Sequence, residues 1–156
     1  MSFSPAERLK FSLRLGDLLV CEGGEAGRTA VWRDEVPDCY FQKALHRLRP
    51  HDTDRDLPRF QYYSTYAAKT AGAFEEGGNK ATIGHLTGEA IRAHRFPWPP
   101  KQEQIIIAEY LDNQSAGLGR LEAALGQQVE RLQEYRQALI TAAVTGQLDI
   151  PAEAAA

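Results

Sequence analysis

Residues 111–145 read LDNQSAGLGRLEAALGQQVERLQEYRQALITAAVT and carry leucines at a strict seven-residue spacing. These leucines are Leu111, Leu118, Leu125, Leu132 and Leu139. A seven-residue repeat places side chains on one stripe of an α-helix, where they are buried only against another helix or an apolar groove. The repeat therefore predicts a docking helix, about 45 Å long between residues 115 and 144 at the standard rise per residue.

The other core position of the heptad is less apolar than the position that the leucines occupy. If the leucines occupy heptad position a, position d holds Leu121, Gln128, Tyr135 and Ala142. A self-sufficient parallel zipper is strongly apolar at both positions, so the pattern favours an antiparallel partner helix or a small bundle. The predicted docking residues are Leu111, Leu118, Leu121, Leu125, Val129, Leu132, Tyr135 and Leu139. The alternative is a helix that packs back on its own domain, although its length exceeds the diameter of a domain of roughly 100 residues.

A proline-rich segment, Phe96-Pro97-Trp98-Pro99-Pro100, precedes the helix and prevents regular backbone hydrogen bonding. We place a domain boundary there, which gives a first domain over residues 1–98, a helical docking region over 99–148, and a disordered tail over 149–156. Residues 101–111 are apolar around most of a helix, which predicts burial at the junction. The polar and glycine-bearing residues 112–119 predict a break or bend, and Gly146 predicts the helix end.

The first domain begins with signals for a short helix and a pair of strands. Ser4-Pro5-Ala6-Glu7 matches a capping box and predicts a helix over Pro5 to Lys10. Compact apolar runs over residues 17–21 and 28–32 flank a glycine-containing turn at 23–27. These runs predict a hairpin-like pair of strands.

The rest of the first domain mixes strand and helix signals. Alternation over residues 41–49 predicts a strand with a basic edge, followed by a polar loop over 50–58. Residues 60–71 are rich in aromatic side chains and predict a buried helix, and Thr87 is placed to cap a single helical turn through Arg92. The fold class is therefore α+β, with a mixed domain followed by a long coiled-coil helix.

Composition places the chain among soluble globular proteins, with 43% hydrophobic and 25% charged residues in a length of 156. No apolar run approaches the roughly 18 residues of a membrane span, and the N-terminus does not read as a signal peptide, which predicts a cytoplasmic location. Cys21 and Cys39 are then expected to be reduced thiols. A zinc site built from these cysteines and His46 would lack the compact ligand spacing of such sites.

The charge is unevenly distributed. Residues 1–100 carry 14 Lys and Arg against 13 Asp and Glu, whereas residues 101–156 carry 4 against 8. This balance permits contact with nucleic acid by the first part but does not by itself indicate it.

Several segments occur in an order that carries more information than any one of them. They are GDLLVCEGG at 16–24 with Gly27-Arg28, TIGHLT at 82–87, Pro99-Pro100 with Glu103-Gln104, Ile107 and Leu111, and Leu132 with RQALI at 136–140 and AVTG at 143–146. Together they resemble the type I restriction-modification DNA specificity subunit over nearly the whole chain.

This resemblance implies a target-recognition domain that reads one half of a split site in double-stranded DNA. It also implies a following helix that pairs antiparallel with a second copy and acts as a spacer. Complete members carry two such units, whereas this chain has one, and its first domain is shorter than usual at its start. The implied protein is a partial or half-length subunit that pairs with a second unit and joins modification and restriction subunits, which perform methyl transfer and cleavage.

The residues supply no convincing catalytic set, because P-loop, Gly-x-Ser-x-Gly, His-Glu-x-x-His and methyltransferase motifs are missing. We therefore expect no enzymatic activity, cofactor or metal. Base readout and phosphate contact use basic, amide and hydroxyl side chains, and two glycine-bearing loops and one strand present them. The predicted DNA-binding residues are Arg28, Lys43, Arg47, Asn79, Lys80, Thr82 and His85. The strand residues among them also fit a merely solvated face, and Trp32 and Trp98 fit core or junction positions better than base stacking.

Two other functions stay open on the sequence alone. The chain fits a protein-interaction scaffold or regulator that keeps the helix but does not bind DNA. A small metal-dependent hydrolase that uses Cys21, Cys39 and the histidines is a more distant alternative.

Overall fold

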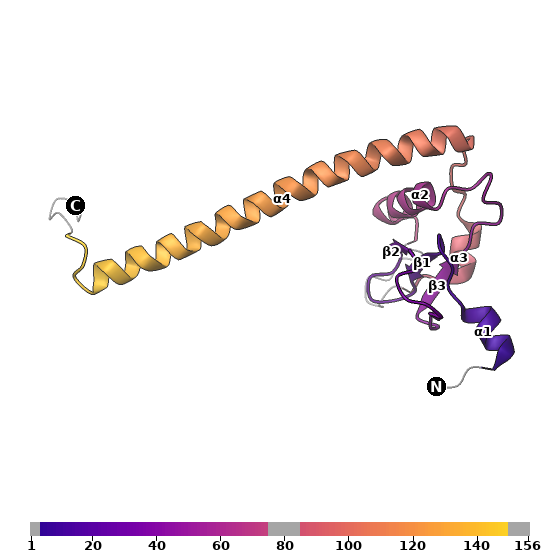
Figure 1. The fold of residues 1–156 in the computed structure, drawn as a ribbon, viewed down its shortest axis with the longest axis horizontal. Coiled ribbons are helices and arrows are strands. Elements are labelled where there is room, and N and C mark those ends of the chain that lie inside the picture. Colours follow the sequence, from indigo (N-terminus) through magenta and orange to yellow (C-terminus); the bar gives the residue numbers. More distant parts are fainter. Residues whose placement is uncertain (1–3, 75–84, 150–156) are drawn as a thin grey trace. The chain divides into compact units, whose positions relative to one another are not determined.

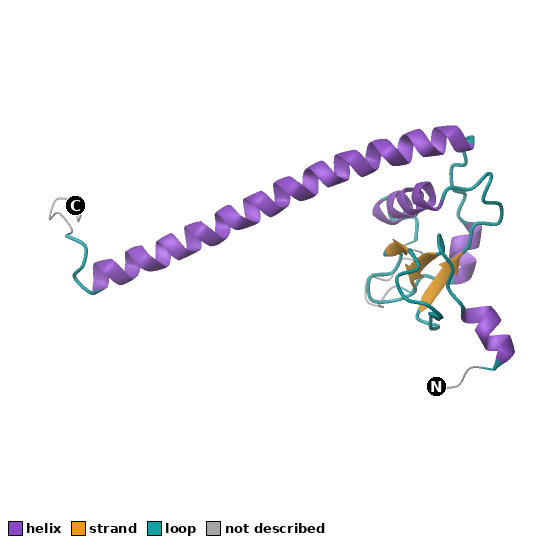
Figure 2. Cartoon of the chain, in the orientation of Figure 1, coloured by secondary structure: helices purple, strands orange, loops and turns teal. Residues whose placement is uncertain are grey.

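The computed structural model describes residues 4–74 and 85–149. The chain divides into two compact units, residues 1–109 and residues 110–156. The first unit holds a three-stranded sheet with helices, and a long helix, α4, occupies most of the second (Figures 1 and 2). This arrangement confirms the predicted α+β class with a long C-terminal helix.

The sheet has the order β2-β1-β3 and is antiparallel throughout. The central strand β1 (Leu18–Cys21) pairs with β2 (Thr29–Val31) on one side and with β3 (Leu45–Leu48) on the other. The predicted hairpin of the first two strands is confirmed. The third strand is shorter than the predicted 41–49, because the backbone N–H of Leu45 donates to the carbonyl of Gln42 at 3.1 Å and turns the chain before the strand.

One face of the sheet is buried against helices. Directly paired residues of neighbouring strands share a face, and the inner face carries Leu18 and Val20, both completely buried. Helix α2 (Pro58–Thr70) packs against β1 and β2, and α3 (Gly88–Ala93) adds Ile91 to the core. The core cluster consists of Val20, Ala68, Phe74, Leu86 and Ile91.

Side-chain caps begin two of the helices as predicted. In α1 (Pro5–Phe11) the Ser4 backbone N–H donates to Glu7 Oε2 at 2.9 Å, and the Glu7 N–H donates to Ser4 Oγ at 3.3 Å. In α3 the hydroxyl of Thr87 accepts from the Ala90 N–H at 3.1 Å. These bonds, reciprocal in α1 and single in α3, satisfy backbone donors that have no partner in the first helical turn.

Helix α2 departs from its prediction in two ways. It begins at Pro58, two residues earlier than predicted, because proline is well suited to the first turn of a helix. It is buried on one face only, through Phe60, Thr65 and Ala68, whereas Tyr66 is 58% exposed. The prediction of a buried helix is therefore wrong for its outer face.

Helix α4 is continuous from Lys101 to Val144, so the predicted break at residues 112–119 is wrong. A glycine inside a helix costs only about 1 kcal/mol relative to alanine, and two such residues do not offset the long helical stretches on either side. Its 44 residues correspond to about 66 Å. The helix ends where predicted, with Gly146 at φ 72° and the Gln147 N–H donating to the Ala142 carbonyl at 2.9 Å.

The first turns of α4 are buried less than the sequence predicts. Only Gln104 and Ala108 are buried, whereas Ile106 is 59% exposed and Tyr110 is 63% exposed. The prediction that this segment is covered on most of its circumference is therefore wrong. Its apolar surface continues toward the leucine stripe on the same helix.

Candidate nucleic-acid interface and docking helix

Two of the predicted recognition segments meet at one end of the sheet. The turn after β1 requires glycine at Gly27, where φ is 81° and the N–H donates back to the Cys21 carbonyl at 2.9 Å. The His85 ring lies against Gly23 so closely that a β-carbon added there would be 3.2 Å from His85 Cε1. The Leu86 N–H donates to the Glu22 carbonyl at 2.7 Å and fixes this approach.

His46 strengthens the same junction from β3. Its Nε2 lies 2.6 Å from the Leu86 carbonyl and donates to it, which ties the segment after residue 85 to the edge strand as well as to β1. We call residues 23–27 the glycine turn and residues 85–87 the His85 segment. The two are held together by the Leu86–Glu22 hydrogen bond and by the contact of His85 with Gly23, and His46 of β3 holds the His85 segment as well.

Alanine at Gly27 is expected to destabilise the first unit by about 2 kcal/mol, since a left-handed backbone is costly for other residues. The added β-carbon would also meet Phe74 Cδ2 at 3.0 Å. Gly24 provides a matched control, because its φ of 71° is also positive but a β-carbon there meets nothing within 4 Å. Chemical denaturation should show a larger loss for Gly27→Ala than for Gly24→Ala, and equal losses would contradict the packing against Phe74.

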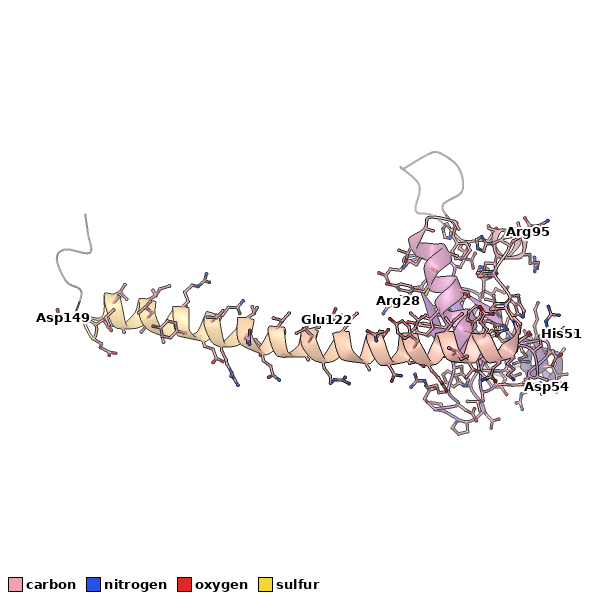
Figure 3. All side chains as sticks on the ribbon, turned by 90° about the horizontal axis from the view of Figure 1, so that it is seen from above. Arg28, His51, Asp54, Arg95, Glu122 and Asp149 are labelled. Carbon is pink, nitrogen blue, oxygen red and sulfur yellow. The ribbon has the colours of Figure 1, made fainter. Side chains whose placement is uncertain are left out.

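The predicted DNA-binding residues occupy different environments. Arg28, Lys43 and His85 are exposed, and Arg47 is half-buried. Arg28 pairs with Glu25 at 3.0 Å, with 72% and 63% of the two side chains exposed, and Figure 3 shows its place among the side chains. The remaining three, Asn79, Lys80 and Thr82, lie outside the described residues.

Arg47 and its neighbour Arg49 point at the protein itself. Both donate to the carbonyl of Ser12, from Arg47 Nη1 at 2.7 Å and from Arg49 Nη2 at 3.0 Å. Arg49 also binds the buried Asp17 through two bonds of 2.7 Å, and this partner raises the pKa of its guanidinium. Sequence reasoning missed this pair, because alternation identifies a strand face but not which distant carbonyl covers it.

A buried amide fixes the junction between the proline segment and α4. Gln104 is completely buried, and its Oε1 accepts from the Leu57 N–H at 3.0 Å. Its Nε2 donates to the carbonyls of Pro99, at 2.8 Å, and Arg55, at 3.1 Å. The sequence signal for this role was a glutamine directly before the apolar run 105–108 and one helical turn before Ala108.

Other contacts reinforce the same junction. Trp98 Nε1 donates to Asp56 Oδ1 at 3.1 Å, which agrees with a junction position for this tryptophan, and Lys101 Nζ donates to the Thr53 carbonyl. Asp56 is buried and also accepts from the N–H groups of His51 and Asp52, at 3.2 Å each. The start of α4 is therefore held to residues 51–57 of the first unit.

The docking residues predicted on α4 are mostly uncovered. Leu111 is half-buried, and the other seven are between 43% and 67% exposed. Figure 3 shows side chains that extend from α4 in several directions around Glu122. Ile140 and Val144, at 49% and 77% exposure, extend the apolar surface to the end of the helix. A solvated helix does not normally carry so long an apolar stripe, so this surface is suited to a partner.

The described residues contain neither a metal-binding cluster nor a disulfide. Within 4–74 and 85–149, no group of three or more His, Cys, Asp or Glu side chains is placed to hold a metal ion. Cys21 and Cys39 are half-buried free thiols. None of the helices in these ranges is long and apolar enough to cross a membrane.

Comparison with known proteins bears on both units. Residues 7–131 match the family described as the type I restriction modification DNA specificity domain. The chain is also 38% identical over 132 residues to the type I restriction enzyme EcoBI specificity subunit of Escherichia coli. That alignment covers 85% of this chain but 27% of the relative, so the chain spans about a quarter of that protein's length.

Proposed function

This chain belongs to the type I restriction-modification DNA specificity family, and on that premise we propose that it recognises part of a target in duplex DNA and helps to assemble a restriction-modification complex. The observation that carries the proposal is the extent of the match, which includes the sheet, the junction and much of α4. In this proposal the chain is not itself an enzyme. Methyl transfer and cleavage are left to the modification and restriction subunits.

The glycine turn and the His85 segment are the proposed recognition site. Arg28 stands on the turn, and its bond to Glu25 is an exposed ion pair of the kind worth about 0–1 kcal/mol. Arg28 can therefore exchange Glu25 for a base edge or a phosphate at little cost. His85 lies against Gly23 and presents an exposed ring beside it. These features support a contact with DNA through both segments.

Helix α4 is the proposed assembly surface. Its uncovered stripe fits the leucine repeat, and the weaker position d favours an antiparallel helix as partner. We propose that this partner is a second copy of the chain or another specificity unit.

The DNA part of the proposal is tested by salt dependence. Binding of the whole chain to duplex DNA, alone and with the modification subunit, is expected to weaken linearly on a plot of log affinity against log salt, because phosphate contacts release counterions. Titration of a labelled duplex by fluorescence anisotropy between low and moderate salt measures the slope. If no duplex binds even at low salt with the modification subunit present, the scaffold function replaces DNA recognition.

A further inference from the structure

Arg47 lies on the face of the sheet opposite Leu18 and Val20, and basic and aromatic side chains from α1 and from the segment before β3 gather around it. Lys10 Nζ lies 5.4 Å from the centre of the Phe11 ring, the Phe11 and Phe41 rings are 5.5 Å apart edge to face, and the Arg47 guanidinium lies 5.2 Å from the Phe41 ring. The Phe41 N–H donates to the Phe11 carbonyl at 3.0 Å and joins the two segments. The segment around residues 10–14 is thereby fixed over β3.

The arginines beneath this segment hold a surplus of positive charge. Asp17 is the acceptor for Arg49, and it also accepts from the Arg14 backbone N–H at 2.8 Å. In the described part of the chain Arg47 forms no ion pair with a carboxylate, and its buried Nε has no hydrogen-bond partner. Burial lowers the pKa of Arg47, and the charges of Arg49 and Arg14 lower it further against the opposing effect of Asp17. An added anion would relieve this repulsion.

Three exposed cations complete what we call the outer basic surface, which consists of Lys10, Arg14, Lys43, Arg47 and Arg49. Lys10, Arg14 and Lys43 form no ion pair within residues 4–74 and 85–149. Glu7, the carboxylate on α1, is occupied by Ser4, whose hydrogen bonds lower its pKa more than the charge of Lys43 does. Glu7 and Asp17, the carboxylates whose contacts are described above, are therefore both engaged by other groups.

We propose that the outer basic surface binds the phosphodiester backbone of duplex DNA, with Lys10, Arg14 and Lys43 contacting phosphates. Arg47 and Arg49 act beneath them as positioning residues that hold Ser12 and its neighbours. This inference rests on the proposed function and extends it by assigning the face of the domain that lies along the backbone. Duplex DNA carries one charge per roughly 1.7 Å of axis, so exposed cations without an ion pair are suited to contact its phosphates.

The position of this surface suits that role. The Glu22 N–H donates to the Ala44 carbonyl at 3.0 Å, so Lys43 is next in sequence to a residue that contacts the start of the glycine turn. A DNA backbone bound at Lys43 would therefore place the adjacent groove of the duplex near the turn that carries Arg28. Phosphate contacts would set the register, and the turn would face the base edges.

The test compares two triple variants of the whole chain that lose the same charge. Lys10→Gln with Arg14→Gln and Lys43→Gln removes the three proposed contacts, whereas Arg55→Gln with Arg92→Gln and Arg95→Gln removes three exposed cations elsewhere. Binding to a 30-base-pair duplex of arbitrary sequence is followed by anisotropy over a range of salt. The first variant should bind on the order of 100-fold more weakly at 0.1 M salt, with a log–log slope reduced by about 3. The control should keep the parental slope to within about 1.

The outcomes separate this proposal from the function on which it rests. If the parent protein binds DNA with a steep salt dependence and both triple variants lose affinity equally, net charge explains binding and the surface assignment is overturned. If the first variant binds DNA normally but no longer joins the modification subunit, the surface contacts protein and the assignment is again overturned. If the parent protein binds no duplex at low salt even with the modification subunit, the proposed function and this inference fail together. Circular dichroism checks that each variant is folded.

Discussion

Replacing both Leu125 and Leu132 with glutamate is expected to leave the protein monomeric. The two side chains are 52% and 67% exposed in the single chain, so the substitutions cost α4 little by itself. In a paired helix each glutamate would enter an apolar seam, where an unpaired charge is strongly unfavourable, and the burial of each leucine, worth about 2 kcal/mol, would be lost. The combined effect should weaken association by at least roughly 1000-fold. Light scattering coupled to size-exclusion chromatography measures the mass.

A control with the same change in charge tests whether the stripe itself is responsible. Ala123→Glu with Gln127→Glu also adds two carboxylates to α4, but at exposed positions away from the heptad leucines. This variant should keep the parental mass, and circular dichroism should show equal helix content in both. A parent protein that is monomeric at all concentrations without another specificity unit would show that a second copy is not the partner. An unchanged mass for the leucine variant of a dimeric parent would show that another surface pairs the chains.

Local signals were sufficient to predict much of the fold. Ser4 with Glu7, and Thr87, act through backbone groups three residues away, so the short-range sequence contains what each cap requires. The turn between β1 and β2 was predictable because glycine tolerates the positive φ observed at Gly24 and Gly27. The leucine repeat likewise predicted a long helix, which α4 confirms. These features depend on periodicity and backbone freedom, which a single sequence displays directly.

The errors arose where the structure of the neighbouring backbone outweighs the preference of single residues. Gly117 and Gly119 predicted a break, but the long helical stretches on both sides keep the backbone helical at these two residues. Alternation predicted a strand from residue 41, but a turn at Gln42 delays it to Leu45. In both cases propensity is a contribution of about 1 kcal/mol, which neighbouring structure overrides.

The loops of the candidate site were predictable from the sequence, but the long-range hydrogen bonds that hold the neighbouring residues were not. Glycine-bearing segments indicated the turn and the residues near His85, which do meet in the structure. The basic alternation also indicated Arg47, yet its hydrogen bond reaches Ser12, 35 residues earlier in the chain. No local pattern specifies such a contact. The same limit applies to Gln104, whose three partners become apparent only when residues 55–57 are brought against α4.

Leucine at Gln104 is expected to destabilise the first unit by about 3–5 kcal/mol, because it retains the volume but removes the hydrogen-bond partner of three partly buried backbone groups. These groups are the Leu57 N–H and the carbonyls of Arg55 and Pro99. Denaturation followed by tryptophan fluorescence reports on this unit, since Trp32 and Trp98 both lie in it. Gln102→Leu makes the same substitution at an exposed position two residues earlier and should change stability by less than about 0.5 kcal/mol.

Glutamate at the same site separates hydrogen bonding from packing. Gln104→Glu preserves the shape and the acceptor for the Leu57 N–H, but its second oxygen would face the carbonyls of Arg55 and Pro99 where the amide donates. The carboxyl can donate to one of them only by taking up a proton, which it does more readily at low pH. Its pKa should therefore be raised in the folded state, and the variant should lose stability as the pH rises from about 4 to 7. A glutamate variant as stable as the parent at pH 7 would show that the amide donors do not hold this junction.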